Sequence, residues 1–133
     1  MYYIGIDISK FKHDCAVIDD SGEIVTPSWS FTNDAKGFSQ LKLLLNSLDT
    51  ETRIGLESTG HYGMNLKLFL ESNNFSFMEF NPLLINRFVK SKSLRKTKSD
   101  SIDCMMIAHY LMTVEYKPCL LYTSPSPRDP KTS

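Results

Sequence analysis

The chain has 133 residues, of which 41% are hydrophobic and 23% charged, a composition typical of one folded domain. No apolar stretch approaches the ~18–20 residues that cross a bilayer, and the N-terminus lacks the features of a signal peptide. The three cysteines are odd in number and widely spaced, which argues against a disulfide framework or a zinc knuckle. We therefore expect a cytoplasmic protein with no membrane partner.

The N-terminal part of the chain predicts an antiparallel meander. Residues 2–8 are apolar on both faces, which indicates a central strand. A second strand over 12–19 leads through the turn cluster at 19–22 to a third strand over 23–31. Pro27 cannot donate a ladder hydrogen bond, so the third strand is predicted to be an edge strand or a bulged one.

Helices and strands are predicted to alternate in the rest of the chain. Tyr62 is assigned to the buried stripe of one of these helices, and residues 90–98, with little apolar content, are predicted to be a loop. The order βββαβαβ, followed by helices, predicts an α/β fold with a mixed sheet flanked by helices. Apolar periodicity and capping signals place the elements in chain order: helix 34–48, strand 52–57, helix 61–72, strand 75–80, short helix 82–89 and helix 99–112.

Residues 1–116 are predicted to form this domain, and residues 117–133 differ in kind. The tail holds four of the six prolines and shows no periodicity, so we expect it to be disordered. Its portion over 119–129 also resembles translated sequencing-adapter sequence. On that interpretation the natural protein continues past residue 116, and the tail has no bearing on function.

The net charge of zero conceals a strong asymmetry along the chain. Six bases and no acid lie between Glu79 and Asp100, so the remaining residues carry a net charge of −6. Repeated cations without neutralising acids favour contact with a nucleic-acid backbone, although a solvated loop would show the same pattern. The candidate contact residues are Arg87, Lys90, Lys92, Arg95, Lys96 and Lys98.

Four carboxylates carry the candidate chemistry. Asp7 and Glu57 each end an apolar strand, and Asp100 and Asp103 lie three residues apart on one face of a predicted helix. Taken singly, each has a structural alternative: an ion pair with the lysines that follow Asp7, a solvated strand end at Glu57, or helix capping at Asp100. Taken together, converging carboxylates would form an oxygen-rich site suited to Mg²⁺ or Mn²⁺, the kind of site that cuts and joins phosphodiesters.

Three segments resemble, in order and spacing, the motifs of the DEDD transposases of the insertion-sequence one-ten family. They are GIDISK at residues 5–10, LESTGHY at 56–62 and KTKSDSIDC at 96–104. This family is related to Piv-type DNA invertases and, in fold, to the RuvC Holliday-junction resolvase. The resemblance covers about residues 2–112.

The resemblance implies a ribonuclease-H-like, RuvC-like fold with the order βββαβαβα. It also implies that Asp7, Glu57, Asp100 and Asp103 are an acidic tetrad binding Mg²⁺ or Mn²⁺ in a DNA recombinase of a mobile element. The partners it implies are DNA, in some members an element-encoded guide RNA, and further copies of the chain, in the nucleoid of a bacterial or archaeal cell. Family members carry a C-terminal domain with a serine that has no counterpart here, so we expect this chain to be incomplete and inactive alone.

Two other functions fit parts of the sequence. A non-catalytic module of the same fold would bind guide RNA or DNA, and metal binding by the four carboxylates distinguishes it from a nuclease. An actin-like phosphotransferase also begins with a strand-end aspartate, but it needs a glycine-rich phosphate turn after that residue. Here no glycine occurs between Asp7 and Gly22, which disfavours the phosphotransferase.

Overall fold

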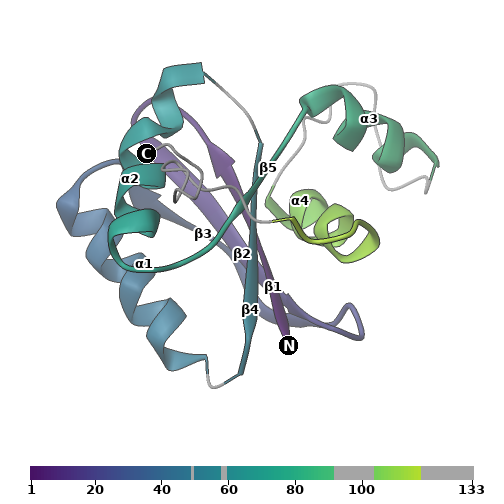
Figure 1. Ribbon diagram of the computed structural model, residues 1–133, viewed down its shortest axis with the longest axis horizontal. Coiled ribbons are helices and arrows are strands. Elements are labelled where there is room, and N and C mark those ends of the chain that lie inside the picture. Colours follow the sequence, from purple (N-terminus) through teal and green to yellow (C-terminus); the bar gives the residue numbers. More distant parts are fainter. Residues whose placement is uncertain (49, 58–59, 92–103, 118–133) are drawn as a thin grey trace, which may run out of the picture.

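A mixed five-stranded sheet forms the centre of the computed structural model, which describes residues 1–48, 50–57, 60–91 and 104–117 (Figure 1). The strands pair in the order β3-β2-β1-β4-β5. β1 to β3 form the predicted antiparallel meander, and β4 and β5 run parallel to β1. The strands are β1 (Tyr2–Ile8), β2 (Lys12–Asp19), β3 (Ile24–Thr32), β4 (Thr52–Glu57) and β5 (Met78–Phe80).

The positions of β1 and β3 agree with the sequence-based prediction. β1 lies between β2 and β4, and Ile4, Ile6 and Ile8 on one of its faces are buried. β3 lies at the edge of the sheet, where the missing N–H of Pro27 breaks no inner ladder. The pairing of β2 with β3 also shifts register near Val17, so this edge is irregular as well.

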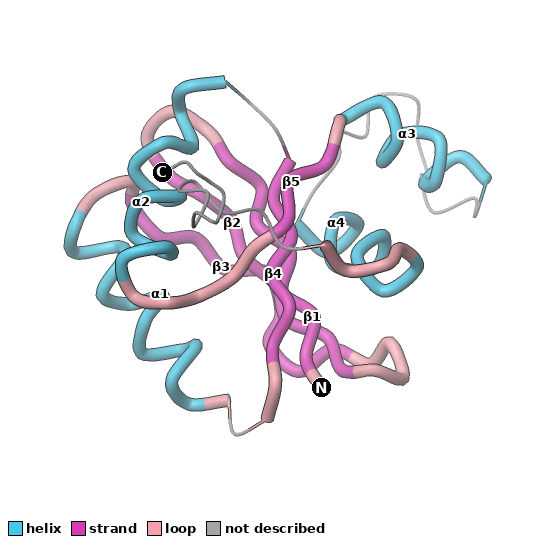
Figure 2. The backbone as a smooth tube through the Cα atoms, in the orientation of Figure 1, coloured by secondary structure: helices cyan, strands magenta, loops and turns pink. Residues whose placement is uncertain are grey.

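One face of the sheet is covered by α1 (Ala35–Ser47) and α2 (Met64–Ser72), as Figure 2 shows. Asp34 caps α1, since its side chain accepts a hydrogen bond from the Gly37 N–H at 2.9 Å. A short 3₁₀ turn, η1 (Gly60–Gly63), leads into α2. The main core lies between these helices and β1, β2 and β4, and its helical members are Phe38, Leu41, Leu45, Leu66 and Leu70.

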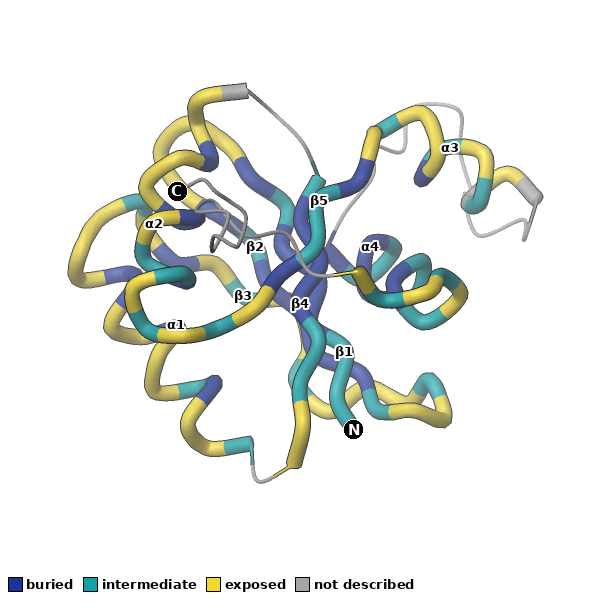
Figure 3. Tube along the Cα trace, viewed as in Figure 1, coloured by how far each residue is buried: buried dark blue, intermediate teal, exposed yellow. Residues whose placement is uncertain are grey.

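The opposite face of the sheet carries α4 (Cys104–Thr113), with α3 (Pro82–Ser91) beside it (Figure 3). Ile85, Ile107 and Leu111 form a second core with Phe80 of β5. α4 crosses β1 at Gly5, where a Cβ atom would lie 2.1 Å from the Cys104 carbonyl oxygen and 2.5 Å from the Ala108 nitrogen. Only glycine allows the helix to approach the strand this closely. None of the described helices is long and apolar enough to cross a lipid bilayer.

Several predicted boundaries differ from the structure around α2 and β5. The helix predicted over 61–72 begins with the η1 turn, which leaves Tyr62 38% exposed, so its assignment to the buried stripe was wrong. β5 is shorter than the strand predicted over 75–80, because Phe75, the first residue of that predicted strand, belongs to the turn that ends α2. Asn74 adopts a φ of 64°, and the Phe75 N–H donates to the Leu70 carbonyl oxygen at 2.8 Å, a helix-ending arrangement.

The C-terminal predictions are tested only in part. α3 extends to Ser91, so Lys90 lies in a helix and the predicted loop over 90–98 was wrong at this residue. The last helix is described from Cys104 onwards, and residues 99–103 of the predicted helix lie outside the described residues. The same holds for residues 118–133 of the predicted disordered tail. Cys15 and Cys104 are buried thiols and form no disulfide.

Candidate active site

Asp7 and Glu57 lie side by side on the two central parallel strands. β1 and β4 pair in parallel register up to Ile6 and Leu56, and the two acids are the next residue of each strand. Neighbouring strands are about 4.8 Å apart, so the two acids lie next to each other where this pair of strands ends. Both residues are half-buried. The structure therefore brings together two of the four carboxylates predicted from the sequence.

Both acids lie on the face of the sheet that α4 covers. Side chains alternate along a strand, so Asp7 shares a face with Gly5, over which α4 packs. In the same way Glu57 shares a face with Gly55, where a Cβ atom would approach Leu111 of α4. The apolar side chains of Ile4, Ile6 and Ile8 lie on the other face, in the first core. The carboxylates thus lie beyond the end of the second core rather than among the buried apolar residues of the first.

Asp14, which was not among the residues predicted from the sequence, lies opposite Asp7 at this edge of the sheet. It pairs directly with Asp7 across the β1–β2 hairpin, so the two side chains share a face. Ser30 on β3 donates a hydrogen bond to the Asp14 carboxylate at 2.5 Å. The symmetry of the hairpin about residues 10–11 was the signal that could have found this residue. Like charges directly opposite each other destabilise a sheet, and a bound cation would relieve that repulsion.

Burial raises the pKa of the Glu57 carboxyl group above its ordinary value of 4.5. The cause is desolvation, which disfavours the charged form when water is withdrawn. A raised pKa in the folded chain means that the protonated form contributes stability below pH 4.5, and this contribution is lost as the pH rises through the folded pKa. A cation bound beside Glu57 would oppose this effect by favouring the charged form.

Glu57→Gln is expected to stabilise the metal-free chain at neutral pH and to have little effect in acid. The amide is neutral at every pH, so the variant avoids the desolvation of a charged carboxylate. Urea denaturation at about pH 4 and about pH 7 measures the difference in free energy of unfolding. Glu51→Gln, at an exposed residue before β4, is the control and should show no such pH dependence. A Glu57→Gln effect of equal size at both pH values would contradict this assignment.

Asp100 and Asp103, the other two predicted ligands, lie outside the described residues. The part of the chain that is described holds no group of three or more His, Cys, Asp or Glu side chains arranged to bind a metal ion. Cys104, the first residue of α4, nevertheless approaches Gly5, two positions before Asp7 on β1. The oxygen donors of Asp7 and Glu57 are of the kind that Mg²⁺ and Mn²⁺ prefer.

Two of the six candidate nucleic-acid contacts are described. Arg87 and Lys90 are exposed on α3, on the same side of the sheet as α4 (Figure 1). They lie three residues apart and so present two positive charges on one side of the helix. The other four, Lys92, Arg95, Lys96 and Lys98, lie outside the described residues.

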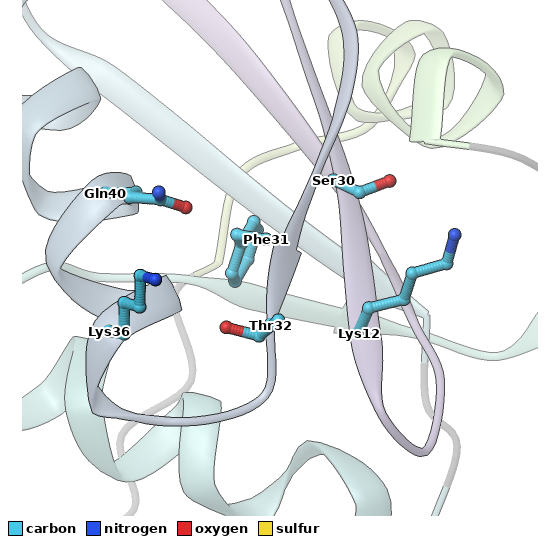
Figure 4. A pocket seen from close by; sticks show the side chains of 6 residues that line it. All are labelled: Lys12, Ser30, Phe31, Thr32, Lys36 and Gln40. Carbon is cyan, nitrogen blue, oxygen red and sulfur yellow. The ribbon is translucent and has the colours of Figure 1, made fainter.

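A pocket of about 240 Å³ opens at the sheet edge formed by β3. Figure 4 shows Lys36 and Gln40 of α1 on one side of β3, with Lys12 and Ser30 on the other. No carboxylate is among the residues that line this pocket. Neither Asp7 nor Glu57 lines it, although its lining residue Ser30 also donates a hydrogen bond to the Asp14 carboxylate.

Sequence comparisons relate the chain to proteins that rearrange DNA. The pilin gene-inverting proteins of Moraxella lacunata and Moraxella bovis are 33% and 34% identical to it, over 81% of this chain and 33% of each relative. The mini-circle putative transposase for IS117 of Streptomyces coelicolor is 28% identical over 84% of this chain and 27% of that protein. The chain thus spans about a third of the length of these relatives.

The chain was also compared with solved structures and with models of protein families. The ethanolamine utilization protein EutJ from Carboxydothermus hydrogenoformans aligns with a TM-score of 0.41 and 7% identity, over 68% of this chain and 40% of that one. A likeness of this size supports no argument about fold or function. The family model of the IS110-type DEDD transposases, described as a transposase, matches residues 4–122. The chain therefore belongs to the IS110-type DEDD transposase family.

Proposed function

We propose that this chain is the metal-binding part of a DNA recombinase that cleaves phosphodiesters and transfers strands. The observation that carries the proposal is the adjacency of Asp7 and Glu57 on neighbouring parallel strands, half-buried and on one face. The names of the relatives, a gene-inverting protein and a transposase, describe DNA rearrangements of this kind. Both activities require breaking and joining DNA strands.

The topology of the sheet supports a ribonuclease-H-like, RuvC-like fold for this part. An antiparallel meander is followed by two parallel strands on the other side of β1, in the order β3-β2-β1-β4-β5. The parallel pairing of β1 with β4 sends their C-terminal ends to the same edge of the sheet. Two acids separated by 50 positions in the sequence are thereby placed together.

Asp7 and Glu57 would hold Mg²⁺ or Mn²⁺, with Asp100 and Asp103 proposed as the remaining ligands from their place in the sequence. When bound, the metal would activate the attacking oxygen and stabilise the leaving oxygen at a phosphate. The contribution of the chain is to fix the carboxylates on rigid strands before the ion arrives. Metal binding would need the charged form of Glu57, whose pKa burial raises, so metal affinity should fall as the pH drops through that pKa.

We further propose that the basic residues of α3 and the segment after it contact the phosphate backbone of DNA or of a guide RNA. Arg87 and Lys90 lie on the same side of the sheet as the carboxylates, which would repel a polyanion without nearby cations. A homo-oligomer and a further domain corresponding to the rest of the relatives' length are proposed partners. The further domain is suggested because this chain covers only a third of the length of each relative.

Binding of this chain to duplex DNA is expected to weaken steeply with salt, because neutralised phosphates release counterions. The double variant Arg87→Gln, Lys90→Gln should weaken binding for every DNA sequence. It should also reduce the slope of log K against log salt by about 2, since each phosphate that a cation neutralises adds about 0.9 to that slope. Fluorescence anisotropy with a labelled duplex at several salt concentrations measures both quantities. Lys42→Gln, at an exposed lysine of α1 on the opposite face, is the matched control.

Neutralising Arg95, Lys96 and Lys98 together should reduce the same slope further. An affinity indifferent to salt, or a Lys42→Gln effect as large as that of the α3 variant, would show that these bases have no electrostatic role in binding.

A further inference from the structure

Phe11 is the most exposed large apolar side chain of the described residues, with 76% of its surface open to solvent. It lies at the tip of the β1–β2 hairpin, three residues after the last residue of β1. Lys10 places its ammonium group 5.1 Å from the centre of the Phe11 ring. Neither the metal site nor the basic residues of α3 give this ring a role.

The backbone that carries the Phe11 ring is held by an ordered set of hydrogen bonds. The Ser9 N–H donates to Nδ1 of the buried His13 at 3.3 Å, and the Ser9 hydroxyl donates to the Lys12 carbonyl oxygen. The Asn33 N–H donates to the carbonyl oxygen of Phe11 itself at 2.9 Å. A fixed loop that nonetheless exposes an aromatic ring loses little conformational entropy when the ring binds a ligand.

Asn33 also joins this hairpin to the η1 turn. Its side-chain amide donates to the Lys10 carbonyl oxygen at 3.1 Å and to the Tyr62 carbonyl oxygen at 3.5 Å. Tyr62 is 38% exposed, and its ring lies 4.6 Å from that of the exposed His61, centre to centre. One side chain thus brings two aromatic-bearing loops together, although they are distant in the sequence.

Both loops leave the sheet at the edge where the carboxylates lie. The hairpin tip follows Asp7 at the end of β1, and η1 follows Glu57 at the end of β4. Because β1 and β4 are parallel, their C-terminal ends emerge together. Exposed aromatic rings, with a lysine beside that of Phe11, are thus carried by loops that start at the same edge of the sheet as the carboxylates.

We propose that Phe11, with Tyr62, His61 and Lys10, forms a stacking platform for unpaired bases of a single-stranded nucleic acid next to the carboxylate site. The proposal rests on the proposed nucleic-acid function and specifies which form of the substrate the site accepts. Every base has a π-face, so stacking on such rings needs no particular sequence, and a neighbouring cation suits the phosphate between two bases. Strand exchange must expose unpaired bases where strands are cut and rejoined.

The test compares the affinity of this chain for labelled oligo-deoxythymidine with its affinity for an abasic oligomer of the same length. The abasic strand keeps the phosphates and lacks the bases, so the difference reports contacts with the bases, and Phe11→Ala shows how much of it is stacking on this ring. The unmodified chain is expected to bind oligo-deoxythymidine about 10-fold more tightly, and Phe11→Ala should abolish most of that preference. Phe11→Trp should retain the preference and show quenching of the new indole fluorescence when the strand binds.

Leu43→Ala is the matched control, because Leu43 is another highly exposed apolar side chain, 72% open to solvent, but lies on α1. It should leave the preference for bases unchanged. Equal affinity of the unmodified chain for both oligomers, or a preference that survives Phe11→Ala, would overturn the stacking platform while leaving salt-dependent binding intact. A Phe11→Ala variant that instead loses self-association shows a protein contact and also overturns it. Failure to bind either oligomer at low salt would count against the proposed function itself.

Discussion

Gly5→Ala is expected to lower the free energy of unfolding by about 3 kcal/mol, the upper part of the range for overpacking a well-packed site. The added methyl group would lie 2.1 Å from the Cys104 carbonyl oxygen and 2.5 Å from the Ala108 nitrogen. Both atoms belong to the backbone of α4, so no side-chain rotation relieves the clash. The helix must move away from β1, and the second core opens with it. Urea denaturation of the two chains measures the loss.

Gly55→Ala separates this clash from the general effect of placing alanine on a central strand. Gly55 is the parallel partner of Gly5 on β4, but a Cβ there would meet only side chains, with Phe80 Cε2 nearest at 2.8 Å. Side chains adjust at a smaller cost, so we expect a loss of about 1 kcal/mol. Equal losses at the two positions would mean that the approach of α4 to β1 does not determine stability.

Asp7→Asn is expected to have opposite effects without and with metal. In the metal-free chain it removes the repulsion between Asp7 and Asp14 across the β1–β2 ladder, so the variant should be slightly more stable, by a few tenths of a kcal/mol. With Mn²⁺ at about 100 times its Kd, the unmodified chain should gain about 2.7 kcal/mol, or roughly 10 °C in Tm. The variant should gain almost nothing, because one oxygen ligand has lost its charge.

This reversal distinguishes a missing ligand from a damaged fold. A misfolded variant would be less stable under both conditions, whereas loss of the ligand alone leaves the metal-free chain intact. Thermal unfolding with and without Mn²⁺ measures both effects. Asp20→Asn, at an exposed turn residue after β2, is the control and should respond to metal as the unmodified chain does.

The sequence predicted the order of the elements because the signals along β1, α1 and β4 are local. The apolar run of β1, the capping signal at the start of α1 and Pro27 in β3 depend on near neighbours in the chain, and the structure agrees with each. The adjacency of Asp7 and Glu57 follows from the same reasoning once β1 and β4 are parallel, since both acids end their strands.

The incorrect predictions depend on information that a local pattern does not contain. Tyr62 was assigned to the core by a helical period of 3.6 residues, but η1 is a 3₁₀ turn with about 3.0 residues per turn, which rotates this side chain toward solvent. Asp14 required the exact register of a hairpin. The joining of the two aromatic loops depends on Asn33, whose three donated hydrogen bonds reach two distant segments. Tertiary contacts of this kind leave no periodic trace in the sequence.

The central claim is that carboxylates from β1 and β4 bind one divalent metal site. Isothermal titration of Mn²⁺ into the unmodified chain and into Asp7→Asn, Glu57→Gln and Asp20→Asn tests it most directly. We predict saturable binding of Mn²⁺ that Mg²⁺ inhibits by competition and that becomes tighter as the pH rises. Both Asp7→Asn and Glu57→Gln should abolish this binding, and Asp20→Asn should leave it unchanged. Binding that persists in Asp7→Asn and Glu57→Gln, or no binding by the unmodified chain at millimolar Mn²⁺, would contradict the claim.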